Sequence, residues 1–318
     1  MICCVLPKGK TDAWDWPERI FLYRPYILEE AERLELQHQV FDKVFDNRLI
    51  FPPIPRPQKI LDCGYGTGSW AIGAAEQHPK CKVDDLNRPF TFPPNNFDLV
   101  HSRLLATGIN RDRWPSYIRD IKRVLKSGGW VQLVEIYFNV QSDNGSITEQ
   151  HALRQWSTQL MGSLEEVKDL RVGTKLRNLL TAAGLTEVDA RMIPLPLSAW
   201  PNDPRMRDIG AANRDNVKKL LPALGLYPFT QRLRMPPQQF AELIARAQQE
   251  ADTHNLKAYF PLQKGCVDGM NPSFLSQLTL SERSSFLGSN GTDVVVLISL
   301  SEDHSKEWEE GLKESPCT

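Results

Sequence analysis

The chain has 318 residues, 41% of them hydrophobic and 24% charged, with a formal net charge of −1. These values are typical of a globular protein with an ample core, and they give no indication of a nucleic-acid partner. Because no apolar run reaches membrane-spanning length and the first residues lack the apolar core of a signal peptide, we expect no membrane association and an intracellular location, cytoplasmic or nuclear.

The first predicted helix follows a loosely ordered arm, residues 1–25, which is punctuated by tryptophan and proline. From residue 27 to about residue 47, apolar side chains recur at helical intervals and acidic residues gather in the first turns, which favours an amphipathic helix. This helix should cover a sheet or the ligand pocket beside it. Four prolines then exclude regular structure until the first strand: Pro52, Pro53, Pro55 and Pro57.

Residues 59–71, KILDCGYGTGSWA, hold the most informative pattern in the chain. A short apolar run ends at Asp62, a turn with three glycines follows, and residues 69–77 favour a helix. Strand, glycine-rich turn and helix form the first unit of an open α/β nucleotide-binding sheet, in which the glycines allow a ligand to approach the backbone closely. The spacing, Asp-x-Gly-x-Gly-x-Gly, departs from the dinucleotide fingerprint and lacks the lysine of a nucleoside-triphosphate loop.

Two further strand and helix alternations follow this unit. Residues 97–101 favour a buried strand, and residues 111–126 favour a helix that stops at Ser127-Gly128-Gly129, before a long strand at 130–138. Farther on, helices are expected at 150–161, 173–183, 205–221 and 237–253, with one strand at 187–193. The prolines between residues 194 and 204 should keep the chain irregular before the third of these helices.

These stretches together resemble a known family. The glycine turn resembles motif I of class I S-adenosylmethionine (SAM) methyltransferases, and NFDLVHSR at 96–103 and VLKSGGW at 124–130 resemble later motifs. Residues 35–39, 90–97 and 257–261 are similar in particular to the fungal LaeA-like methyltransferases of secondary metabolism. The resemblance spans about residues 26–262 and implies an α/β fold: a Rossmann-like sheet with a helical lid at about 145–255, SAM as cofactor and methyl transfer to a small-molecule acceptor.

The sequence departs from that family in two places. Only 35 positions separate Asp62 from Phe97, whereas one βαβ unit alone takes about 30 residues or more. An intact sheet would need two strands and two helices there, so we expect a sheet truncated around its second and third strands, with a deletion at Val83-Asp84. The second departure begins near Gln263, where residues 263–318 read as a divergent, partly disordered tail. Its apolar run at 294–298 is either the missing strand or an exposed, aggregation-prone segment.

The resemblance assigns cofactor contacts to residues at and after the glycine turn. The methionine part of SAM would lie against the Asp62 carboxylate and the backbone of Gly64, Gly66 and Gly68. Farther along the chain, Asp84 matches the position that pairs with the adenine amino group, and Leu86 could line the ring. With the second strand shortened, Asp84 or Asp85 could instead hold the ribose, and the alternative for both is a solvated acidic loop.

His101 is the candidate for a polar wall of the methyl site, because it lies near the carboxyl end of its strand, where open α/β sheets bind ligands. Its alternative is a structural histidine that caps the next turn. Glu135 and Tyr137 are weaker candidates, for which packing and rim hydration are the competing explanations. No metal site is predicted, because the six cysteines have no metal-ligand spacing.

Three functions remain open from the residues: a small-molecule methyltransferase, a methyltransferase-like regulator that acts through a protein partner, and a cofactor-deficient homologue. Methyl transfer itself needs an acceptor held in line with an activated methyl group, so no compact catalytic signature is required. Because the shortened interval should remove one wall of the adenosine pocket, we expect the chain to bind SAM weakly and to be a weak or inactive enzyme.

Overall fold

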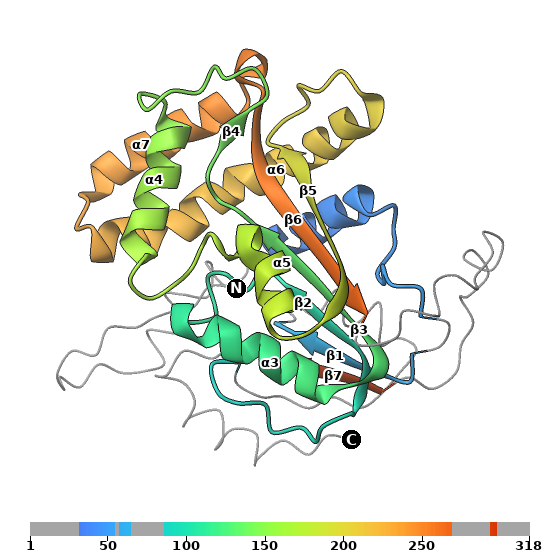
Figure 1. Ribbon diagram of the computed structural model, residues 1–318. Helices are drawn as coiled ribbons and strands as arrows, with labels where there is room; N and C mark the ends of the chain where they lie inside the picture. Colours follow the sequence, from blue (N-terminus) through green and yellow to red (C-terminus); the bar gives the residue numbers. More distant parts are fainter. Residues whose placement is uncertain (1–31, 55–56, 65–85, 269–292, 298–318) are drawn as a thin grey trace, which may run out of the picture.

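The computed structural model describes residues 32–54, 57–64, 86–268 and 293–297, and its centre is a mixed sheet (Figure 1). Strands β1 (Lys59–Cys63), β2 (Phe97–Arg103) and β3 (Leu125–Ile136) lie side by side and run parallel. Their inner residues are almost fully buried, as expected for parallel strands that are covered on both faces. The predicted Rossmann-like α/β sheet is therefore confirmed.

Beyond β3, the sheet continues with antiparallel strands. Strand β6 (Ala258–Asp268) pairs with β3, while β5 (Thr186–Pro196) and the short β4 (Gln141–Ser142) both pair with β6. Strand β6 passes through Gln263 and continues to Asp268, so the first residues of the predicted tail lie in the sheet, while residues 269–292 and 298–318 lie outside the described residues. Strand β5 includes Pro194 and Pro196, which were expected to lie in irregular chain; it tolerates them because an edge strand has unpaired backbone groups.

Strand β7 (Asp293–Leu297) lies on the other side of β1 and runs parallel to it, with Lys59 opposite Asp293 and Cys63 opposite Leu297. In a doubly wound sheet, that place belongs to the second strand of the chain. A strand from the C-terminal part therefore occupies the edge that the short interval after Asp62 was expected to leave open. The predicted helix 69–77 and the join at Val83-Asp84 lie outside the described residues.

Removal of residues 269–318 is expected to lower the melting temperature by about 5–15 °C, because β1 loses its backbone partner and becomes an exposed apolar edge. Thermal unfolding and light scattering measure the loss of stability and the resulting self-association. A chain that ends at Leu297, and so keeps β7, is the matched control. If the shorter chain melts and scatters like this control, the pairing of β7 with β1 contributes nothing to stability.

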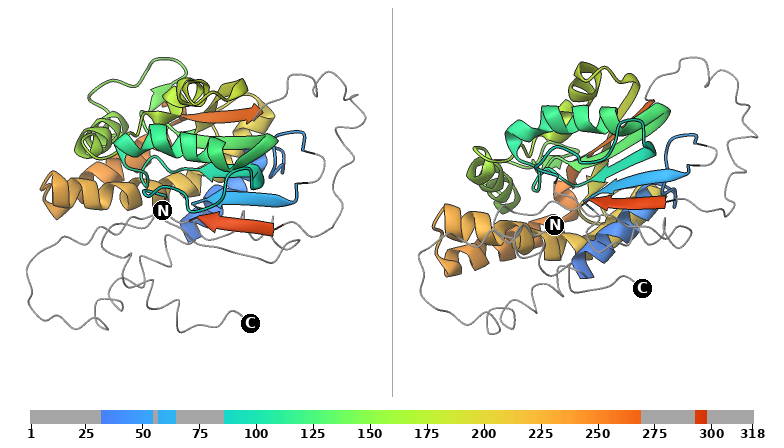
Figure 2. Two further views of the ribbon diagram at one scale, coloured as in Figure 1. Left: turned by 60° about the horizontal axis from the view of Figure 1, so that its bottom comes forward. Right: turned by 90° about the horizontal axis from the view of Figure 1, so that it is seen from below.

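Helices cover both faces of the sheet (Figure 2). Helix α3 (Trp114–Val124) and helix α5 (Leu176–Ala182) lie on one face, and a helix at residues 32–44 lies on the other. Proline in its first turn starts α3, whose buried side includes Ile118 and Ile121. The helix ends before the predicted residue 126 because the chain already pairs with β2 at Leu125, although the regular pairing begins at Trp130 as predicted.

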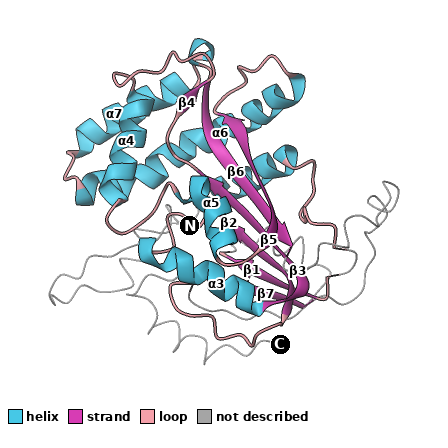
Figure 3. Ribbon diagram, in the orientation of Figure 1, coloured by secondary structure: helices cyan, strands magenta, loops and turns pink. Residues whose placement is uncertain are grey.

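The remaining helices gather at one end of the sheet as a lid (Figure 3). They are α4 (Ala152–Leu164), α6 (Pro204–Tyr227) and α7 (Pro237–Ala251), with the short helix η3 (Pro228–Arg232) between α6 and α7 and η4 (His254–Leu256) after α7. Two other short helices, η1 (Arg111–Arg113) and η2 (Val172–Lys175), lead into α3 and α5 on the sheet. Asp203 caps α6 by accepting a hydrogen bond from the Met206 amide at 2.8 Å. The four helices predicted in this region are present. No helix in the described part of the chain is long and apolar enough to span a membrane.

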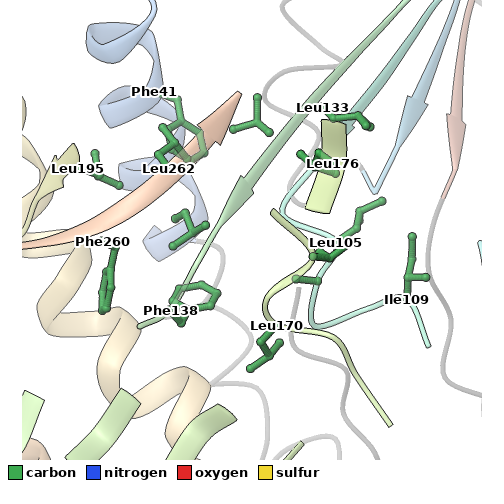
Figure 4. Close-up of a cluster of buried hydrophobic side chains, with 14 of the residues drawn as sticks. Phe41, Leu105, Ile109, Leu133, Phe138, Leu170, Leu176, Leu195, Phe260 and Leu262 are labelled. Atoms are coloured by element: carbon green, nitrogen blue, oxygen red, sulfur yellow. The ribbon is translucent and has the colours of Figure 1, made fainter. Parts of the chain in front are cut away.

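Aromatic side chains join the lid to the sheet. Phe138, just after β3, and Phe260 of β6 pack edge to face with their ring centroids 5.7 Å apart (Figure 4). Trp156 of α4 contacts both rings and donates its indole hydrogen bond to the Leu221 carbonyl of α6. The lid and the sheet therefore share one hydrophobic core.

The helix at 32–44 lies antiparallel to α6 and is bound to it along its length. Glu32 accepts a hydrogen bond from Lys219 at 2.7 Å at one end, and Lys43 donates to Asp208 at 2.6 Å at the other. Between them, buried Arg33 donates to the Asn216 side chain at 3.3 Å. The predicted amphipathic helix thus covers the sheet and is also attached to the lid.

Candidate functional site

The candidate site lies at the carboxyl ends of β1, β2 and β3, where open α/β sheets bind ligands. Asp62, His101 and Gln132 are cross-strand neighbours, so their side chains form a polar row on one face of the sheet. All three are buried, with at most 2% of their surface exposed. Polar residues in the middle of a parallel sheet carry a desolvation cost, which makes their partners informative.

Asp62 has a polar atom whose hydrogen-bonding capacity is unmet. Its Oδ2 is buried and has no hydrogen-bond partner among the residues that the structure describes. Burial raises the pKa of this carboxyl to about 7, while the nearby Arg103 charge acts in the opposite direction. Two residues later, Gly64 has φ 77°, a conformation that glycine adopts without strain as the chain turns away from the strand. Asp62 is therefore suited to a cationic group brought by a ligand.

His101 is held inside the sheet rather than at its rim. Its Nδ1 lies 2.6 Å from Nε2 of Gln132, which also donates to the Leu49 carbonyl at 2.8 Å. The Gln132 Oε1 accepts from the Phe51 amide at 3.0 Å, so this pair also anchors the segment before β1. Burial lowers the pKa of His101 well below its usual range and keeps the ring neutral. These contacts favour a structural role for His101, in which the ring is bonded to Gln132 and does not cap the next turn.

Glu135 organises the turn that follows β2. Its two oxygens accept hydrogen bonds from the amides of Leu105, at 2.8 Å, and Ala106, at 3.1 Å. Leu104, just before them, has φ 58°, a left-handed conformation that is unfavourable for leucine. Burial raises the pKa of Glu135 to about 8, against the effect of the two amide hydrogen bonds. The carboxyl group thus holds a strained turn that directly follows Arg103 at the end of β2.

Arg103, which sequence reasoning missed, ends β2 next to Asp62. Its guanidinium lies over the Phe41 ring, 5.3 Å from the centroid, and its Nη1 is 3.4 Å from Nδ1 of His38. Both contacts come from the helix at 32–44. Two signals were available, the family resemblance of residues 35–39 and that of the motif at 96–103, which ends at Arg103, but neither indicated that His38 and Arg103 would meet.

The other predicted cofactor residues are less informative. Leu86 is fully buried in the core, and its carbonyl accepts a hydrogen bond from Nε of Arg113 at 3.1 Å. The residues Gly66, Gly68, Asp84 and Asp85 lie outside the described residues. A hollow of about 230 Å³ lies instead between β5 and the start of α6, where Pro194, Trp200 and Met206 line it, and Asp62 is not part of it.

Comparisons with known proteins find a methyltransferase domain, and both a methyltransferase and a regulator among the relatives. Residues 36–190 match a family model described as a methyltransferase domain. The methyltransferase pytC of Aspergillus terreus is 26% identical over 74% of this chain and 79% of its own length. The secondary metabolism regulator laeA of Aspergillus fumigatus is 28% identical over 73% of this chain and 68% of its own length. Among solved structures, phosphoethanolamine N-methyltransferase 2 of Haemonchus contortus in complex with SAM has a TM-score of 0.45 and 16% identity, over 83% of this chain and 61% of that chain.

Proposed function

We propose that this chain, whose residues 36–190 match a methyltransferase domain and which has pytC and laeA proteins among its relatives, is a class I SAM-dependent methyltransferase that transfers the methyl group of SAM to a small molecule in a fungal biosynthetic pathway. The matched domain supports a methyltransferase, and the family resemblance implies SAM as its cofactor. The acceptor class is our proposal, supported by the similarity to a pathway methyltransferase and by a lid of helices that could enclose a small molecule.

One observation carries the cofactor assignment to particular residues. Asp62 is a buried carboxyl group with an unpartnered oxygen at the end of β1, and the chain turns at Gly64 just beyond it. SAM presents an ammonium group that would satisfy this oxygen. We therefore assign Asp62 and the backbone of Gly64 to the methionine part of SAM, and this assignment retains the expectation made from the glycine motif.

SAM, when bound, supplies a methyl group that is already activated on a sulfonium. The work left to the chain is to bind, orient and exclude water. Glu135 fixes the turn at Leu104–Ala106, and the lid is packed against the sheet through Trp156 and Phe260. With His101 neutral and bonded to Gln132, we assign no proton transfer to it. An acceptor that must lose a proton would lose it to water or to a group of its own.

A regulator that acts through a protein partner is the second candidate, favoured by the name of the laeA relative. The two candidates differ in where the methyl group goes. Saturation binding of radiolabelled SAM to the full chain comes first, and binding of NADH without binding of SAM would reject the assignment. The labelled methyl is then followed into the organic extract and the protein fraction of a fungal culture. Label in the extract supports the proposal, whereas label in protein alone, or in neither fraction despite SAM binding, contradicts it. The Asp62→Asn variant, which lacks the carboxyl group assigned to SAM, is the control: label that it still transfers does not depend on the proposed site.

A further inference from the structure

Asp62 and Arg103 carry opposite charges and lie close together, but they do not form an ion pair. Each influences the ionisation of the other, yet no hydrogen bond or salt bridge connects them in the described part of the chain. Buried or partly buried opposite charges this close normally close into an ion pair, because each then satisfies the other. The Asp62 carboxyl group keeps an oxygen without a partner among the described residues, and Arg103 lies two residues beyond His101, the cross-strand neighbour of Asp62, at the carboxyl ends of β1 and β2.

Other parts of the protein hold Arg103 away from Asp62. The Phe41 ring lies under the guanidinium, and Nη1 reaches His38, whose pKa is lowered by burial and by the Arg103 charge. Neutral His38 is then able to accept a hydrogen bond from the guanidinium through Nδ1. The helix at 32–44 thus holds the cation in place and leaves its remaining donors for another partner.

We propose that Arg103 binds the carboxylate of the amino-acid end of SAM, while Asp62 binds the ammonium group on the same carbon. In an amino acid, the ammonium and carboxylate groups are both bonded to the same carbon atom. A site for it therefore needs an acidic and a basic side chain that are adjacent but not paired with each other. Arginine suits a carboxylate particularly well, because its planar fork can donate two parallel hydrogen bonds. This proposal rests on the proposed function. The glycine motif assigns the methionine part of SAM to backbone groups, and the proposal adds the Arg103 side chain to these contacts.

Decarboxylated SAM provides a direct test, because it keeps the ammonium and sulfonium groups and lacks only the carboxylate. Titration calorimetry of the full chain with each compound should show that SAM binds about ten- to a hundredfold more tightly than decarboxylated SAM. In Arg103→Met this preference should disappear, through loss of SAM affinity with the affinity for decarboxylated SAM unchanged. Arg103→Lys should keep part of it. Arg191→Met, which removes an exposed arginine on β5, is the matched control and should bind like the unaltered chain.

The possible failures are distinguishable. If the unaltered chain binds neither compound, the proposed function is wrong. If it binds both equally, the carboxylate has no charged partner and the role of Arg103 is rejected without any variant. Equal loss of both affinities in Arg103→Met would make Arg103 a structural residue. Unchanged affinity for both would mean that Arg103 faces something else, such as an anionic acceptor, and would also overturn the proposal.

Discussion

Replacement of Glu135 with alanine is expected to lower the free energy of unfolding by about 3–5 kcal/mol, because it leaves two buried amides without acceptors. The amides of Leu105 and Ala106 are held by the two oxygens of this one side chain. The same carboxyl group supports the left-handed Leu104, so its loss also releases a strained turn at the ends of the strands. Urea denaturation followed by circular dichroism measures the change.

Two further variants identify the cause of that loss. Glu135→Gln keeps one acceptor but turns an amide N–H towards the second backbone N–H, so its stability should fall between those of alanine and the unaltered chain. Glu242→Ala on α7 removes an exposed glutamate and should change stability by less than about 0.5 kcal/mol. A Glu135→Ala variant as stable as this control would show that the turn does not depend on the carboxyl group.

The fold was predictable where the pattern is local and unpredictable where partners are distant in sequence. Strand β1 follows from an apolar run bounded by glycine, and α3 follows from helical periodicity with a proline in its first turn. The chain after Gln263 was expected to form a divergent tail because it becomes polar. Strand β6 instead continues to Asp268, because β3 and β5 pair with it on both sides, and this part of the pairing depends on residues 70 or more positions away.

The candidate site shows the same division. Asp62 adjoins the glycine motif, so a family pattern was sufficient to select it. Arg103 has its role through His38 and Phe41, which reach it only because the helix at 32–44 crosses the ends of the strands. His101 was selected for its position near a strand end, but its bond to Gln132 depends on the register between β2 and β3. No spacing rule in a single sequence encodes contacts of this kind.

The affinity for SAM is expected to rise by about fivefold between pH 6 and 7 and to level off above about pH 8, because Asp62 must lose its proton before it can pair with an ammonium group. The pKa of this carboxyl is raised to about 7 by burial in the free protein. The native chain therefore holds a proton that the unfolded chain, with an aspartate pKa of about 3.9, has already released. The contribution of Asp62 to stability is present below that unfolded value and declines as pH rises through about 7, so the free protein should become less stable over the range in which SAM binds more tightly.

Asp62→Asn separates this titration from others nearby. Arg103 stays charged throughout the range. Burial lowers the pKa values of His38 and His101, so both histidines lose their protons at lower pH than Asp62 does. The variant should bind SAM about ten- to a hundredfold more weakly at pH 7.5, with little dependence on pH, because a neutral amide offers no charge to the ammonium group. Calorimetry in two buffers of different ionisation enthalpy would also detect the proton released from the unaltered chain at pH 6. A SAM affinity that is flat from pH 6 to 7.5 in the unaltered chain, or a pH slope that persists in Asp62→Asn, would assign the proton to another group and remove Asp62 from the cofactor site.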